Sequence, residues 1–187
     1  MVVFFGDSRA QQWPAPENLP QFLFVNRGIG SQTSAQVALR FDAYVRLLEP
    51  DILLVQVCVN DLKTLPLFPE QAAQIIENCQ RNLDSIIQQA RSIGAWVILT
   101  TVFPVGEPGL ERRPVWSDAI ADSINTVNEY IHSLAADDVI ILDAYALLAD
   151  DRGLVRPELG LDELHLNETG YALLNEHLIA LLRNIGE

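Results

Sequence analysis

Ser8 is the residue of this sequence best placed for nucleophilic chemistry. It follows Gly6 and Asp7, directly after a short apolar run near the start of the chain. A serine at the turn from a strand into a helix exposes its hydroxyl group, which can attack a carbonyl carbon, and its backbone N–H points the same way. Serine also commonly caps the start of a helix, so the tripeptide leaves both roles open.

His165 is preceded by a carboxylate that could orient it. Asp162 stands three residues earlier, in a loop before the last predicted helix. A turn of this length aims the carboxylate at one ring nitrogen while the other ring nitrogen faces the edge of the sheet. That arrangement fixes the tautomer of the histidine and stabilises its protonated form, as a general base requires. An isolated histidine is more often structural, but this one comes with an orienting residue.

Two further segments offer hydrogen-bond donors for a negatively charged oxygen. Asn60 follows a long apolar run and presents a side-chain N–H₂ group, although an Asn-Asp turn would explain the pair equally simply. The segment 26–33 offers backbone N–H groups before a capped helix, which suits a small anion. Gly28 and Gly30 also begin a dinucleotide-binding fingerprint, but Thr33 stands where the third glycine would be.

Five apolar runs predict the strands that position these residues, namely 2–5, 22–25, 52–59, 96–102 and 139–142. Because they are apolar at nearly every position, they fit a parallel sheet covered on both faces. Amphipathic segments between them predict helices, of which the first runs from Thr33 to Leu48 and the last follows Asn167. We therefore predict an α/β three-layer sandwich, with a five-stranded, parallel, doubly wound sheet of the flavodoxin-like kind, in one domain over residues 1–187.

The predicted topology brings the polar motifs to one edge of the sheet. Right-handed crossovers place the carboxyl ends of all parallel strands on the same side, where ligands bind in such folds. The irregular stretch 104–114 follows the fourth strand, so it is either a surface loop or a rim that faces the substrate.

Composition excludes several classes of function. The chain of 187 residues has 25 acidic and 12 basic side chains and a net charge of −13, which argues against a nucleic-acid partner. No apolar run approaches the ~20 residues that span a bilayer, and we expect no leader before the first motif. Cys58 and Cys79 form neither a disulfide framework nor a zinc site, so we expect two free thiols in a cytoplasmic protein.

Taken together, these motifs resemble those of the SGNH hydrolases, also called GDSL esterases/lipases. The tripeptide ending at Ser8, the glycine-bearing loop, Asn60 and the Asp162-x-x-His165 pair occur in the family's order and spacing over nearly the whole chain. The chain is similar to small single-domain members such as the catalytic subunits of platelet-activating-factor acetylhydrolase.

The resemblance implies a role for each matching residue. Ser8 would be the nucleophile, His165 the general base and then acid, and Asp162 the residue that orients it. The oxyanion hole would consist of the Ser8 backbone N–H, the Asn60 side chain and one backbone N–H from the second block. Aligned with the family, that last donor falls at Ser31 instead of the usual glycine, with Gly30 as the alternative.

Two departures from the family pattern lie next to these residues. Arg9 follows the serine where the family name has leucine, and Cys58 stands where the third block usually has glycine. Cys58 should crowd the space beside Asn60.

The function implied is a serine esterase that hydrolyses short acyl or acetyl esters through an acyl-enzyme, without metal or organic cofactor. Its partner would be a small-molecule ester, and the oligomeric state stays open. Two alternatives remain: an O-acyltransferase with the same triad, and a catalytically silent α/β module that binds a nucleotide or flavin.

Overall fold

Five parallel strands form the centre of the computed structural model, which describes residues 1–110 and 118–185. The strands are β1 (Val2–Gly6), β2 (Phe24–Gly28), β3 (Ile52–Gln56), β4 (Trp96–Thr100) and β5 (Val139–Leu142), in the order β2-β1-β3-β4-β5. Every neighbouring pair is parallel. This order is the doubly wound, flavodoxin-like arrangement, so the predicted fold class is confirmed.

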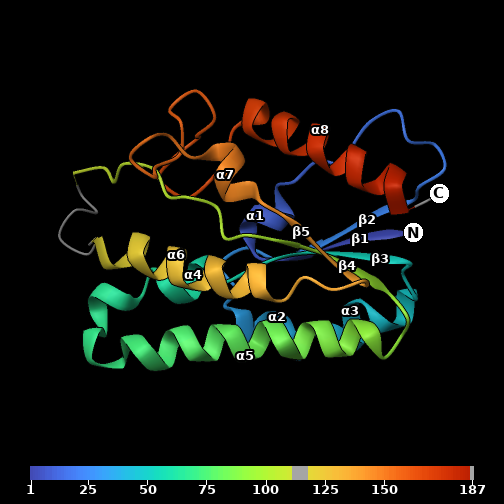
Figure 1. Cartoon of the computed structure of the whole chain (residues 1–187), viewed down its shortest axis with the longest axis horizontal. Helices are drawn as coiled ribbons and strands as arrows, with labels where there is room; N and C mark the ends of the chain where they lie inside the picture. Colours follow the sequence, from blue (N-terminus) through green and yellow to red (C-terminus); the bar gives the residue numbers. More distant parts are fainter. Residues whose placement is uncertain (111–117, 186–187) are drawn as a thin grey trace.

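Helices cover both faces of this sheet (Figure 1). One layer contains α2 (Ser34–Leu39), α3 (Phe41–Tyr44), α5 (Ala72–Arg91) and α6 (Asp118–Ser133), and the other contains α7 (Ala144–Leu148) and α8 (Glu168–Ile185). Two short helices, α1 (Ser8–Gln11) and α4 (Val59–Leu62), begin just after β1 and β3. Three 3₁₀ turns complete the connections, η1 (Arg46–Leu48), η2 (Leu65–Leu67) and η3 (Pro69–Gln71).

Strands β1, β3, β4 and β5 are largely apolar because their alternate side chains enter two different cores, whereas the edge strand β2 contains Asn26 and Arg27. Val3 and Phe5 of β1 pack with the α2–α5–α6 layer, whereas Val2 and Phe4 pack against the α8 layer. Successive side chains of a strand point to opposite faces, so a sheet covered twice needs apolar residues at every position.

Glycine at position 6 allows β1 to lie in the middle of the sheet. A Cβ atom there would lie 1.8 Å from the Gln56 backbone oxygen, which no side chain could tolerate. Gly28 at the end of β2 is similarly constrained, because a Cβ atom there would lie 2.1 Å from the Gln11 backbone nitrogen. These two glycines let the ends of three adjacent strands and helix α1 approach one another closely.

Several predicted elements differ from the observed ones. Strand β2 covers Phe24–Gly28 instead of 22–25, and β4 ends at Thr100 instead of residue 102. The helix predicted from Thr33 to Leu48 is broken at Arg40, whose backbone leaves helical geometry between α2 and α3. The Arg40 guanidinium donates to the backbone oxygens of Arg27 and Gly6, at 2.8 Å each, beneath the sheet edge. Strand β3 ends at Gln56 instead of residue 59 because the chain turns sharply at Cys58, where φ is +88°.

The prediction of two free thiols is wrong, because Cys58 and Cys79 form a disulfide. Cys79 lies on the buried face of α5, beside the turn that follows β3, and the two Cα atoms are 5.9 Å apart. Disulfides persist in oxidising compartments. The bridge therefore removes the basis on which a cytoplasmic location was expected.

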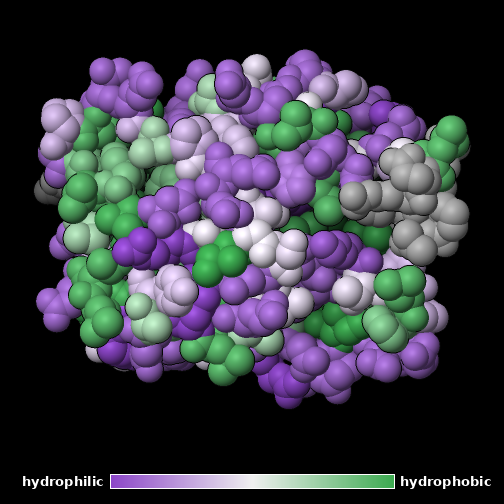
Figure 2. All heavy atoms as spheres, turned by 180° about the vertical axis from the view of Figure 1, so that it is seen from behind, coloured by the Kyte–Doolittle hydropathy of each residue, from purple (hydrophilic) through white to green (hydrophobic). Residues whose placement is uncertain are grey.

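The surface shown in Figure 2 is largely hydrophilic, with hydrophobic atoms gathered at the end that holds the chain termini. Leu23, which precedes β2, and Trp96, which begins β4, are among the exposed hydrophobic residues. They lie at the amino ends of strands, away from the edge where Ser8 lies. No helix in the described part of the chain is long and apolar enough to cross a membrane.

Candidate active site

The sheet register explains why motifs distant in sequence meet at one edge. Gly6, the last residue of β1, pairs with Gly28 of β2 on one side and with Gln56 of β3 on the other. The segments that leave these three strands are therefore adjacent. They include Ser8, the segment 29–31 and Asn60.

Ser8, His165 and Asp162 form one hydrogen-bonded chain. The Ser8 Oγ atom lies 3.0 Å from Nε2 of His165. The other ring nitrogen, Nδ1, lies 2.8 Å from Oδ2 and 3.0 Å from Oδ1 of Asp162. This is the order of contacts that a nucleophile, a general base and an orienting carboxylate require.

The Asp162 carboxylate also organises the loop that contains His165. Its Oδ1 atom accepts hydrogen bonds from the backbone N–H groups of Leu164, at 2.8 Å, and His165, at 2.7 Å. Partial burial acts to raise the pKa of Asp162, but the hydrogen bonds from the His165 ring and these two N–H groups outweigh it and hold the pKa below 3.8. Asp162 is thus ionised at neutral pH, as stabilisation of a protonated histidine requires.

The expected oxyanion donors lie in the segments that follow β2 and β3. Asn60 is buried, and its Nδ2 atom donates to the Gln32 backbone oxygen at 3.0 Å. Ser31 has a φ of +63°, so the left-handed backbone that glycine would adopt freely occurs here with a serine. Gly30 lies close to Ser8, because a Cβ atom on it would be 3.8 Å from Cβ of Ser8.

Asp61, which the sequence did not single out, holds this loop in place. Its carboxylate accepts hydrogen bonds from the backbone N–H and the Oγ of Ser34, both at 2.8 Å. Burial raises the pKa of Asp61, and these hydrogen bonds from Ser34 oppose that rise. The dipeptide Asn60-Asp61 therefore forms hydrogen bonds with the segment 32–34 at both Gln32 and Ser34. In the sequence, the only indication of the Asp61–Ser34 contact was the position of Asp61 next to Asn60.

The two charged residues that flank Ser8 are completely buried. Asp7 is the N-cap of helix α1, and its Oδ1 atom accepts from the Arg9 backbone N–H at 2.9 Å. Burial raises the pKa of Asp7 from 3.8 to about 6, against the opposing hydrogen bond and charge of Arg9. Burial also lowers the pKa of Arg9 to about 10, so its side chain stays protonated at neutral pH.

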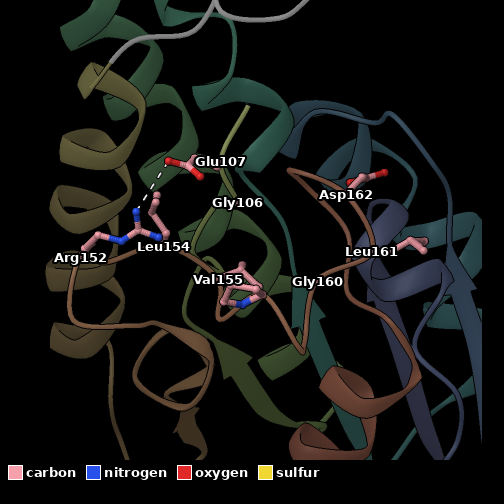
Figure 3. A pocket seen from close by; sticks show the side chains of 9 residues that line it. Gly106, Glu107, Arg152, Leu154, Val155, Gly160, Leu161 and Asp162 are labelled. Carbon is pink, nitrogen blue, oxygen red and sulfur yellow. Dashed lines mark ion pairs between the residues drawn. The ribbon is translucent and has the colours of Figure 1, made fainter. Parts of the chain in front are cut away.

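A small pocket lies beside Asp162 (Figure 3). It measures about 220 Å³, and Glu107 and Arg152 among its lining residues form an ion pair at 3.7 Å. Gly106 and Glu107 line it, so this part of the stretch 104–114 borders a pocket, while residues 111–114 lie outside the described residues. Within residues 1–110 and 118–185, no cluster of three or more His, Cys, Asp or Glu side chains could hold a metal ion.

Comparison with known proteins identifies the family. The chain matches the GDSL-like lipase/acylhydrolase family over residues 4–173 and belongs to it. Members of this family are carboxylic ester hydrolases, in agreement with the class of enzyme predicted. A search of the curated proteins found no match.

Solved structures with the same fold include three with related descriptions. A candidate acylhydrolase from Bacteroides fragilis has a TM-score of 0.81 at 24% identity, over 98% of this chain and 86% of its own. A protein from Streptococcus pneumonia described as a candidate platelet activating factor has a TM-score of 0.80 at 25% identity, over 97% and 83%. The acetyl xylan esterase AlAXEase has a TM-score of 0.75 at 23% identity, over 96% and 98%.

Proposed function

We propose that the chain is a single-domain serine esterase that hydrolyses short-chain acyl esters, acetyl esters above all. The observation that supports this most directly is the 3.0 Å contact of Ser8 Oγ with a histidine whose other ring nitrogen binds the Asp162 carboxylate. In this proposal Ser8 is the nucleophile, His165 the general base and Asp162 the residue that orients it.

The first half of the reaction forms an acyl-enzyme. Ser8 Oγ bonds to the ester carbonyl carbon while His165 Nε2 takes the hydroxyl proton. The carbonyl π electrons move onto the oxygen, giving a tetrahedral oxyanion. When this intermediate collapses, the bond to the alcohol oxygen breaks and His165 returns its proton to that oxygen. Asp162, held ionised, stabilises the protonated histidine between the two proton transfers.

The oxyanion is held by N–H donors that face the substrate carbonyl. The Ser8 backbone N–H, the Asn60 side chain and the backbone N–H of Ser31, or of Gly30, fill these roles in our proposal. Asn60 has two amide N–H bonds, and one of them is taken by the Gln32 oxygen. The other is available for the oxyanion. Water then attacks the acyl-enzyme by the same steps and releases the acid.

Two observations favour a small substrate without negative charge. One neighbour of similar fold is an acetyl xylan esterase. The net charge of −13 also disfavours anionic substrates, because they would approach against the field of the protein. We therefore propose acetyl esters of neutral or cationic alcohols.

Labelling with a fluorophosphonate, followed by mapping of the adduct, tests the proposal. We expect the label on Ser8 and none on the Ser8→Ala variant, which should stay folded and lose hydrolysis of p-nitrophenyl acetate. An unlabelled wild-type protein, or an active Ser8→Ala variant, would exclude the serine mechanism. A series of p-nitrophenyl esters of increasing acyl length then tests the preference for acetyl. Product analysis with a competing alcohol distinguishes hydrolysis from acyl transfer.

A further inference from the structure

The side chain of Arg9 is fully buried directly beside the nucleophile. Arginine is almost never fully buried unless its charge and donors are paired. Here the guanidinium donates to three backbone carbonyl oxygens. Nε donates to Leu164 at 2.7 Å, Nη1 to Phe103 at 3.0 Å and Nη2 to Pro104 at 3.2 Å. It also lies over the Phe103 ring, 5.1 Å from the ring centroid.

The first of these bonds links the two halves of the proposed catalytic machinery. Arg9 is the next residue after Ser8, and Leu164 is the residue before His165. The hydrogen bond from Arg9 Nε to the Leu164 oxygen therefore joins segments that are 155 residues apart in sequence. It connects the residue after Ser8, the proposed nucleophile, with the residue before His165, the proposed general base.

The backbone of Arg9 is fixed as firmly as its side chain. Its N–H donates to Asp7 Oδ1 at 2.9 Å, and its carbonyl oxygen accepts from the Tyr171 hydroxyl at 2.8 Å. The guanidinium therefore extends from a backbone that is itself held in place by hydrogen bonds. The bonds to Phe103 and Pro104 extend this anchor to the loop after β4, and that loop contacts the His165 loop through the Gly106 N–H and the Glu163 oxygen, at 2.9 Å.

We propose that Arg9 is a positioning residue that sets the distance between Ser8 Oγ and His165 Nε2, an inference that rests on the proposed serine mechanism. Arg9 is buried behind the reacting groups and acts through Leu164. The planar guanidinium presents its donors in a fixed fork, so it can hold three carbonyl groups at once. A side chain that only filled this space would leave those carbonyls unpaired and the His165 loop free to shift.

Two substitutions test this role. Arg9→Met keeps much of the length of the side chain but removes every donor, whereas Arg9→Lys keeps the charge and a donor but loses the fork. The readouts are kcat and KM for p-nitrophenyl acetate, together with the rate at which a fluorophosphonate labels Ser8. For Arg9→Met we expect kcat and the labelling rate to fall by about 10²-fold, the effect of a misplacement of roughly 1 Å. KM should change little, and Arg9→Lys should lie between Arg9→Met and the wild type.

A matched control separates positioning from loss of stability. Leu182 is fully buried in the α8 layer and belongs to none of the motifs at the sheet edge, so Leu182→Ala should destabilise the fold while kcat stays at the wild-type value. The inference is overturned if Arg9→Met or Arg9→Lys, measured at a temperature where it is folded, keeps the wild-type kcat. It is also overturned if only KM changes, or if Leu182→Ala loses rate in proportion to its stability.

The same experiment distinguishes failure of the inference from failure of the proposed function. If Ser8 of the wild-type protein is labelled and Arg9→Met is labelled at the same rate, only the role of Arg9 is refuted. If wild-type Ser8 is not labelled, the serine mechanism and the role of Arg9 are refuted together. Should Arg9→Met fail to fold, Arg9→Lys decides, with a reduced kcat and an unchanged KM as the expected result.

Discussion

The buried carboxylate of Asp7 should destabilise the protein at neutral pH. Asp7 is completely buried, and one of its oxygens accepts from the Arg9 N–H. Among the described residues, nothing donates a hydrogen bond to the other oxygen, Oδ2. Burial raises the pKa of Asp7 from 3.8 to about 6, even with the charge of Arg9 nearby. The folded protein therefore holds this proton more tightly than the unfolded chain does.

The pH dependence follows from the direction of that shift. Between pH 3.8 and about pH 6, the folded state keeps the Asp7 proton while the unfolded state has released it. The free energy of unfolding consequently falls as pH rises through this window, and above it the loss is constant. A pKa that is about 2 higher in the folded state corresponds to a loss of about 3 kcal/mol.

Asp7→Asn should remove this loss. Asparagine keeps the oxygen that accepts from the Arg9 N–H and carries no charge, so it resembles the protonated aspartic acid. Relative to the wild type, its free energy of unfolding should be similar near pH 4 and higher by up to about 3 kcal/mol at pH 7. Urea denaturation of both proteins across this range measures the difference, with equal m values as a check on two-state behaviour.

A control with the opposite sign makes the test specific. The hydrogen bond from Arg91 lowers the pKa of the exposed Asp138, so this carboxylate contributes stability above pH 3.8 that is lost as pH falls. Asp138→Asn should therefore destabilise the protein at neutral pH, and the effect should vanish in acid. A stability difference for Asp7→Asn that is flat with pH, or that grows as pH falls, would refute the reasoning.

Three further changes have defined outcomes. Asp162→Asn should lower kcat by about 10⁴-fold because the amide cannot stabilise a protonated His165, and steady-state kinetics would detect any milder loss. Asn60→Ala should slow the reaction about 10²–10³-fold by removing one oxyanion donor, whereas an unchanged kcat would exclude Asn60 from the hole. Cys79→Ser should lower the free energy of unfolding by about 3 kcal/mol, since the bridge to Cys58 spans a separation of 21 residues. Dithiothreitol should destabilise the wild type and leave this variant unaffected.

The parallel sheet could be predicted because the physics behind its strands is local and repetitive. Continuous apolar runs such as 52–55 are typical of strands covered on both faces, and amphipathic segments between them indicate crossover helices. Once the sheet is parallel, its carboxyl edge collects the residues that follow each strand. The hydrogen-bonded array of Ser8, Asp162 and His165 lies at that edge, where the sequence motifs predicted it.

The contacts that the sequence did not reveal all depend on distances between elements. The pairing of Cys58 with Cys79 needs the packing of α5 against the turn after β3, which no spacing rule provides. The break at Arg40 follows from carbonyl groups of other segments that its side chain reaches. In the same way, Arg9 stands out in the sequence only as a departure from a family pattern, and the positioning role that we propose for it rests on its hydrogen bond to the Leu164 oxygen in the folded chain.

Ser8 lies between two buried charged residues, Asp7 and Arg9. The contacts of these two residues give a reason for the destabilising carboxylate of Asp7. Asp7 holds the N–H of Arg9, and Arg9 in turn holds the carbonyl of Leu164 next to His165. Ser8 is thereby fixed through its neighbours in the chain, and the ionised carboxylate of Asp7 stabilises the buried positive charge of Arg9. Strained or costly groups of this kind persist where surrounding contacts hold them and where they serve a site. Because asparagine retains the acceptor for Arg9 but not the charge, Asp7→Asn separates the two effects: stability at neutral pH should rise while the hydrogen bond that places Ser8 is kept.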